Sequence, residues 1–155
     1  MFRRQEGVLQ VLLAHPGGPF WERKDEGAWT IPKGQCDEGE ELLATAIREF
    51  TEETSLVPHG PFFPLGAVRQ RAGKTVHAWS FEGDADVTRM RSNLMHVEWP
   101  PNSRKMIACP EIDRYGWFDL GEAKKKINAA QAEFLERLDN VLEARTSDAD
   151  GETSW

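Results

Sequence analysis

The apolar and polar positions of this chain follow two different periods. Strand-like runs are short, contain β-branched or aromatic residues, and are bounded by glycine, proline or polar clusters. They are expected at 7–15 (GVLQVLLAH), 28–34 (AWTIPKG), 65–70 (LGAVRQ), 74–83 (KTVHAWSFEG), 96–99 (HVEW) and 114–120 (RYGWFDL). The third and fourth runs flank Ala72 and Gly73, so they predict a hairpin.

Two segments carry the period of a helix instead. The stronger is GEELLATAIREFTEETSL (39–56), which a proline-rich stretch ends. The other, 129–145, repeats apolar residues at Phe134, Leu135, Leu138, Val141 and Leu142. Strands mixed with two main helices predict an α/β sandwich. We expect one domain over 1–145, followed by a polar, disordered tail at 146–155.

Composition and charge narrow the functional classes. The 155 residues carry a net charge of −7, which disfavours binding to a nucleic-acid duplex because that needs a basic face. There is no apolar run long enough for a membrane span, so no membrane partner is expected. Cys36 and Cys109 form no spaced pair, which favours a reducing cytoplasm over a disulfide or zinc framework. The acidic balance also requires a cation to bridge any phosphorylated substrate.

The stronger helix separates its apolar and acidic residues. At about 100° per residue, one arc forms the expected core stripe. That stripe contains Leu43, Ala46, Ile47, Phe50 and Thr54. Glu49, Glu52 and Glu53 fall together on the opposite arc, at i, i+3 and i+4. Arg48 is the one cation in the stretch REFTEET and can pair with Glu52.

Two interpretations of this acidic arc compete. A run of charges on a helix usually forms a solvated face. Like charges at i, i+4 nevertheless cost a few tenths of a kcal/mol each, and several carboxylates facing one point are what a hard divalent cation needs. A metal site would cancel the repulsion and would let an acidic protein bind a phosphate.

The spacing resembles the Nudix box, G-x5-E-x7-R-E-U-x-E-E-x-G-U, where U is a large apolar residue. Gly34 is followed by Glu40, then by Arg48-Glu49 and Phe50, and then by Glu52-Glu53 and Leu56. The one departure is Ser55, where the family has glycine. Ser55 follows the helix directly, so we expect it to take the left-handed conformation that glycine favours there.

The resemblance implies a Nudix hydrolase with an α/β/α sandwich around a mixed β-sheet. Such an enzyme is a metal-dependent pyrophosphohydrolase that cleaves a nucleoside diphosphate linked to another group, by attack of water on phosphorus. Nucleotides or dinucleoside polyphosphates are the favoured substrates, and Mg²⁺ or Mn²⁺ is the expected cofactor. Carried over by position, the metal ligands are Glu49, Glu52, Glu53 and the backbone carbonyl of Gly34. Arg48 orients the glutamates, and Glu40 supports it.

Weaker signals complete the expected site. Glu111 in the loop before the last strand is a candidate ligand or base, as in some Nudix enzymes; otherwise it is a surface acid. Lys33, Arg69 and Arg71 are candidate phosphate contacts or solvated cations. Trp21, Trp29, Trp79 and Trp99 are candidates to stack on a base, with Trp29 in the lead-in the first choice, although aromatics on short strands are more often core.

Two other functions remain open at this stage. A non-catalytic Nudix-fold module would bind a nucleotide or a protein, but such modules typically lose box glutamates, and all of them are present here. An isomerase on the same fold would need an additional group of His or Cys residues for its chemistry, and the sequence shows none. The segment MFRRQE leaves room only for a short first strand, unless the start is trimmed.

Overall fold

The computed structural model describes residues 1–151 as short strands and three α-helices. The strands are β1 (Phe2–Gln5), β2 (Val8–Pro16), β3 (Phe63–Arg69), β4 (Thr75–Ser80), β5 (Leu94–Glu98), β6 (Met106–Pro110) and β7 (Ile112–Asp119). The α-helices are α1 (Leu42–Thr54), α2 (Leu120–Lys126) and α3 (Ala132–Gly151), with short 3₁₀ turns η1 (Val87–Arg89) and η2 (Ala129–Gln131).

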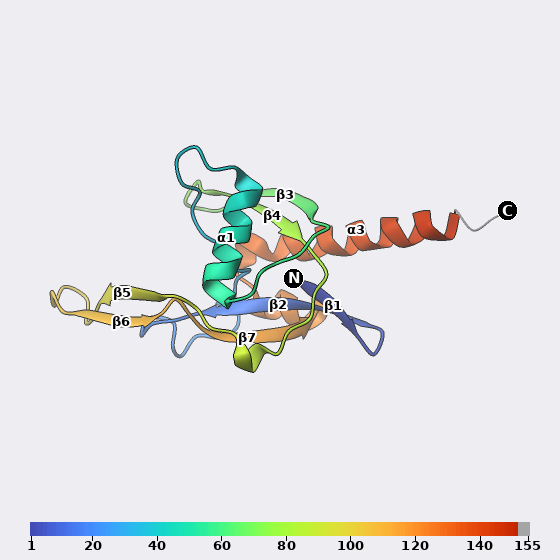
Figure 1. Cartoon of the computed structure of the whole chain (residues 1–155). Helices are drawn as coiled ribbons and strands as arrows, with labels where there is room; N and C mark the ends of the chain where they lie inside the picture. Colours follow the sequence, from blue (N-terminus) through green and yellow to red (C-terminus); the bar gives the residue numbers. More distant parts are fainter. Residues whose placement is uncertain (152–155) are drawn as a thin grey trace.

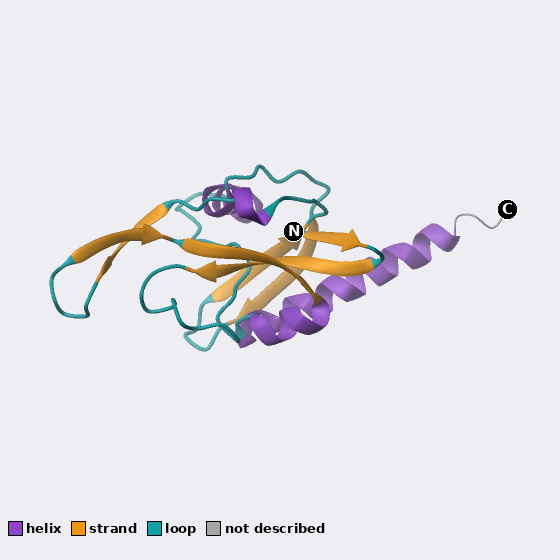
Figure 2. Cartoon of the chain, turned by 90° about the horizontal axis from the view of Figure 1, so that it is seen from below, coloured by secondary structure: helices purple, strands orange, loops and turns teal. Residues whose placement is uncertain are grey.

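The helices lie on both sides of the strands. Figure 2 shows α1 above the strands and α3 below them, which confirms the α/β/α arrangement. The three small sheets are β1-β2-β7, β3-β4 and β5-β6, and all their strand pairs are antiparallel. Parallel pairing within the described residues is limited to the single bridges Phe2↔Glu82 and Trp29↔Ile127. The mixed character of the expected sheet is therefore confined to these bridges.

Two clusters of buried side chains hold these layers together. In the larger one, α3 packs Phe134, Leu135 and Leu138 against the strands, and Val141 and Leu142 lie beside them. All five apolar positions predicted for this helix therefore contact the core. In the smaller cluster, Phe50 of α1 packs with Leu12, Phe81 and Met90. Phe50 and Phe81 meet edge to face, with ring centroids 5.1 Å apart.

The structure confirms one predicted hairpin and changes other predicted elements. The β3–β4 hairpin is confirmed, and its turn is closed by the Gln70 N–H donating to the Lys74 carbonyl. The run 28–34 is not a strand: it makes only the bridges of Trp29 and Thr30, because Pro32 and Gly34 interrupt a ladder. The segment MFRRQE does form a short strand, β1. Strand β6 was not expected from the sequence.

The first part of the expected disordered tail, 146–155, is helical in the structure. Helix α3 continues through Gly151, so residues 146–151 are helical rather than irregular (Figure 1). Hydroxyl groups of Thr146 and Ser147 bond to carbonyls one turn earlier, at Leu142 and Glu143. The remaining positions, 152–155, lie outside the described residues. Over the described range, every helix is too short or too polar to cross a bilayer.

Candidate active site

The first residue of the predicted site is Gly34, which lies against the Glu49 side chain of helix α1. A Cβ atom added at Gly34 would lie 1.7 Å from the Glu49 carboxyl carbon and about as close to both of its oxygens. A larger residue at position 34 would therefore displace the Glu49 carboxylate from its present position. The Glu49 carboxylate lies directly against the Gly34 backbone, so two of the predicted site residues are neighbours in space.

Arg48 contacts carboxylates from the loop and from its own helix. Its guanidinium donates to both Glu40 oxygens, at 2.9 and 3.0 Å, and to Glu49 at 3.1 Å and Glu52 at 3.2 Å. It also donates to the carbonyl of Gln35 at 3.1 Å. These hydrogen bonds lower the pKa of Glu40 to about 2. One cation therefore ties the loop before α1 to two of the three box glutamates.

Glu53 does not belong to a solvated face. Its side chain is 2% exposed, and one of its oxygens accepts a hydrogen bond from the Lys33 backbone N–H at 3.0 Å. Burial raises the pKa of Glu53 to about 8, and the nearby charges of Glu111 and Glu49 add to that rise. Burial also raises the pKa of Glu49, against the opposing effect of Arg48. The solvated interpretation is therefore wrong for this side chain.

The C-terminal end of α1 is held by backbone groups from a distant segment. Asn93 donates its N–H to the Glu52 carbonyl at 3.0 Å, and the Asn93 carbonyl accepts from the Glu111 N–H at 3.0 Å. The Tyr115 hydroxyl donates to the Glu53 carbonyl. Asn93 therefore joins the glutamate helix to the loop that carries Glu111, a connection that no sequence motif signalled.

Ser55 ends the helix as expected. Its φ and ψ are 62° and 19°, which confirms the left-handed conformation, and its N–H donates to the Thr51 carbonyl. The Ser55 hydroxyl also donates to the Arg91 carbonyl at 2.6 Å. This second hydrogen bond attaches the end of α1 to the segment that contains Arg91. It needs the serine hydroxyl, which the glycine of the family pattern lacks.

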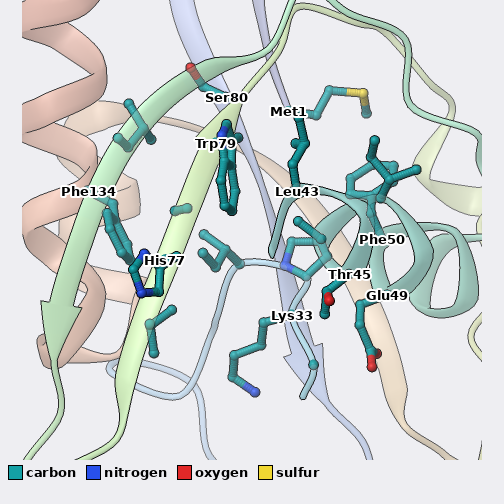
Figure 3. A pocket seen from close by; sticks show the side chains of 18 of the residues that line it. Met1, Lys33, Leu43, Thr45, Glu49, Phe50, His77, Trp79, Ser80 and Phe134 are labelled. Atoms are coloured by element: carbon teal, nitrogen blue, oxygen red, sulfur yellow. The ribbon is translucent and has the colours of Figure 1, made fainter. Parts of the chain in front are cut away.

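A cavity of about 840 Å³ opens between α1 and the β3–β4 hairpin. Figure 3 shows Trp79 and His77 of β4 on one side, Leu43 and Phe50 of α1 on the other, and Lys33 and Glu49 together at one end. Gly34 and Glu111 also line it, as do Gln70 and Lys74 of the hairpin turn. The cavity combines an apolar interior with charged groups at one end, which is the usual character of a small-molecule site.

Three of the predicted substrate contacts lie elsewhere. Trp29 is 6% exposed in the larger core cluster, and its indole N–H donates to Asp25 at 2.8 Å, so it is not available to stack on a base. Arg69 and Arg71 are exposed and do not line the cavity. Gln70, which lies between them at the hairpin turn, lines the cavity instead.

Gln131 is a further residue that the sequence did not single out. It is fully buried, and its side-chain oxygen accepts from the Thr30 hydroxyl at 2.9 Å and from the Ile31 N–H at 3.0 Å. It therefore fixes the segment that leads to Lys33 and Gly34 from a position about 100 residues away in the sequence.

The donor chemistry fits a hard divalent cation, although the carboxylates are not gathered into one cluster. Among residues 1–151, no three His, Cys, Asp or Glu side chains are arranged to enclose a metal ion. Like charges repel, and the glutamates accept from two separate donors: Glu49 and Glu52 from the Arg48 guanidinium, and Glu53 from the Lys33 N–H. Glu49 against the Gly34 backbone nevertheless supplies oxygen ligands of the kind that magnesium and manganese prefer.

Comparison with known proteins decides the family. The family model of the NUDIX domain matches residues 1–138. The chain belongs to the Nudix family. The Xenopus laevis protein "Nucleoside diphosphate-linked moiety X motif 6" is 37% identical over 71 residues, which cover 43% of this chain and 32% of that protein. Nudix hydrolase 10 of Arabidopsis thaliana is 60% identical over 30 residues, covering 19% and 11%. The chain thus matches about a third or less of the length of these relatives.

Solved structures support the Nudix fold over nearly the whole chain. An Ap4A hydrolase from C. elegans, in a binary complex, superposes with a TM-score of 0.59 at 22% identity, covering 92% of this chain and 93% of that one. The Nudix domain of Shewanella oneidensis NrtR, complexed with ADP ribose, also gives 0.59, at 20% identity and with coverage of 91% and 82%. At these identities the likeness is one of fold.

Proposed function

We propose that this chain is a metal-dependent pyrophosphohydrolase that cleaves nucleoside diphosphates linked to another group. The observation that carries the proposal is that Lys33, Gly34, Glu49 and Glu111 all line one cavity, which at about 840 Å³ is large enough for a nucleotide. The names of the relatives support the same substrate class: a nucleoside diphosphate-linked moiety X motif protein, an Ap4A hydrolase, and a Nudix domain that binds ADP ribose.

In this proposal the carboxylates hold Mg²⁺ or Mn²⁺. Glu49, Glu52, Glu53 and the Gly34 carbonyl are the ligands, and Arg48 keeps Glu49 and Glu52 oriented. A bound ion supplies charge compensation for the diphosphate and an attacking water of lowered pKa. Glu53 would bind such an ion as a carboxylate, because a ligand carboxylate must be ionised.

The remaining groups bind substrate and move a proton. Lys33 at the cavity end faces the anionic diphosphate, and Trp79 offers a flat apolar surface to the base. Water attacks one phosphorus, the anhydride oxygen leaves with the other phosphate group, and Glu111 accepts the proton that the water releases. Each of these residues lines the same cavity, so no rearrangement of the fold is needed to bring them to one substrate.

A substrate panel tests the proposal. Nucleoside triphosphates, dinucleoside polyphosphates and ADP ribose are incubated with the full chain in Mg²⁺, in Mn²⁺ and in a chelator, and phosphate-containing products are separated and identified. We expect turnover with metal and none with chelator. Absence of turnover across the panel, together with nucleotide binding that is indifferent to metal, would instead establish the non-catalytic module.

A further inference from the structure

The β5–β6 hairpin, residues 94–110, projects from the body as a separate arm. Figures 1 and 2 show it extending away from the helices and the other strands in both views. Of the eight large apolar side chains that are exposed among the described residues, four lie on this arm. They are Leu94, Trp99, Met106 and Ile107. Half of the exposed large apolar residues are thus concentrated in a segment that contributes little to the core.

The arm also has free hydrogen-bonding edges. Strands β5 and β6 pair only with each other, so each leaves one row of backbone N–H and C=O groups without a strand partner. On one face, Leu94, His96 and Glu98 stand opposite Pro110, Ala108 and Met106, and every one of these side chains is exposed. An isolated two-stranded ribbon is marginally stable in water, and a free apolar edge is a template for another strand.

The charges on the arm point to an acidic partner. Arg104 and Lys105 lie at its tip, and neither forms an ion pair with any described residue. Glu98, the one carboxylate of the arm, is used within the turn, since it accepts the Arg104 N–H at 2.7 Å. The chain as a whole carries a net charge of −7, so the body beyond the arm is strongly acidic.

We propose that two copies of this chain associate through their β5–β6 arms. A second copy supplies everything that the arm lacks: an identical free strand edge, a matching apolar face, and an acidic body for the basic tip. A twofold axis lets one surface serve both copies, because residue i of one copy then contacts residue j of the other and the reverse. Pairing of one free edge of each arm across the axis satisfies those backbone groups and places the exposed apolar side chains of the two arms next to each other on the combined sheet.

Sedimentation velocity of the full chain over a dilution series from the micromolar to the nanomolar range tests this proposal. We expect a reversible monomer–dimer equilibrium. The double substitution Leu94→Ser with Met106→Ser should raise the dimer Kd at least about tenfold, as expected when apolar anchors leave an interface core. The two side chains are 64% and 60% exposed in the single chain, so their replacement does not disturb the core.

Val57→Ser is the matched control, because Val57 is also 64% exposed but lies outside the arm. It should leave the dimer Kd unchanged. Lys105→Glu should weaken association most at low salt, since charge attraction between copies is screened by salt. A chain that stays monomeric throughout the series overturns the proposal, and so does a dimer that the arm substitutions leave intact. Sedimentation needs no turnover, so the result is independent of the proposed hydrolase activity.

Discussion

The backbone N–H of Lys33 donates to the buried carboxylate of Glu53 at 3.0 Å. This bond joins the segment before the box to the last turn of helix α1, across 20 positions of the sequence. Glu53 is thereby fixed in the protein interior beside Phe50 and Thr54, which are also buried. The buried carboxylate whose pKa is raised to about 8 is therefore held by a hydrogen bond from a separate segment of the chain.

Removal of one box carboxylate should abolish most turnover. Glu49→Gln and Glu53→Gln keep the side-chain shape and remove a ligand charge, and each should lower kcat at least about 10²-fold, the lower range for a lost catalytic acid or base. Glu136→Gln, an exposed carboxylate on α3, is the control and should leave kcat unchanged. Steady-state rates in saturating Mg²⁺ measure the effect; near-normal turnover in both site variants would show that these glutamates hold no metal.

The stability of the metal-free protein should fall as the pH rises. The pKa of Glu53 in the folded state is about 8, against an ordinary value of 4.5, so folding favours the protonated form. Its contribution to the free energy of unfolding is complete below about pH 4.5 and is lost as the pH rises through about 8. Urea melts in chelator across this range should show the decline, and Glu53→Gln should flatten it.

Addition of Mg²⁺ at the upper end of that range is the complementary measurement. An ion that binds the folded state alone raises the free energy of unfolding. We expect the gain to be larger for the unsubstituted chain than for Glu53→Gln. An equal gain in both proteins would place the bound ion away from Glu53.

Substitutions at Ser55 separate two contributions to the stability of the C-terminal end of α1: the side-chain hydrogen bond and the left-handed strain. Ser55→Ala keeps the left-handed strain and loses the hydrogen bond to the Arg91 carbonyl, so it should destabilise the fold by about 1 kcal/mol. Ser55→Gly loses the same bond but relieves strain of about 1–2 kcal/mol, offset by the greater entropy of glycine in the unfolded chain. Glycine should therefore be the milder substitution in denaturant melts. The reverse order would mean that the left-handed strain at position 55 is smaller than the entropic cost of glycine.

Trp79 should contribute to substrate affinity more than to rate. Trp79→Leu removes the aromatic surface on the cavity wall, and KM should rise about tenfold, since stacking a base on an aromatic ring contributes about 1–3 kcal/mol. Trp21→Leu is the control, because Trp21 does not line the cavity. Comparison of kcat and KM for the best substrate of the panel decides the question: an unchanged KM would mean that the base lies elsewhere.

The local patterns of the chain predicted its main elements well. Helix α1, the β3–β4 hairpin and the apolar stripe of α3 all follow from period and turn residues. The burial of Glu53 could not be predicted that way, because helical spacing places it with Glu49 and Glu52, and only the approach of Lys33 shows that it is enclosed. Trp29 was assigned to the site from its place next to the box, whereas tertiary packing puts it in the core.

Long-range contacts account for the other differences. The hydrogen bond from Asn93 to Glu52 connects segments about 40 residues apart, and no pattern in either segment predicts this contact. The same holds for Gln131 and the Thr30–Ile31 segment. The sequence predicts only one strand of the arm, since HVEW indicates β5 while MIACP is too short and irregular in its alternation to indicate β6.

The cavity shares its walls with the interior of the protein. Phe134, Leu135 and Leu138 line it and also belong to the larger core cluster. A substitution that enlarges the room for a bulkier substrate therefore removes apolar contacts that hold α3 to the strands, and one that fills the cavity tightens the core. Substitutions that change the accepted substrate size are therefore expected to change the melting temperature as well. Engineering the cavity for a larger substrate would need a compensating stabilising change on the outer face of α3.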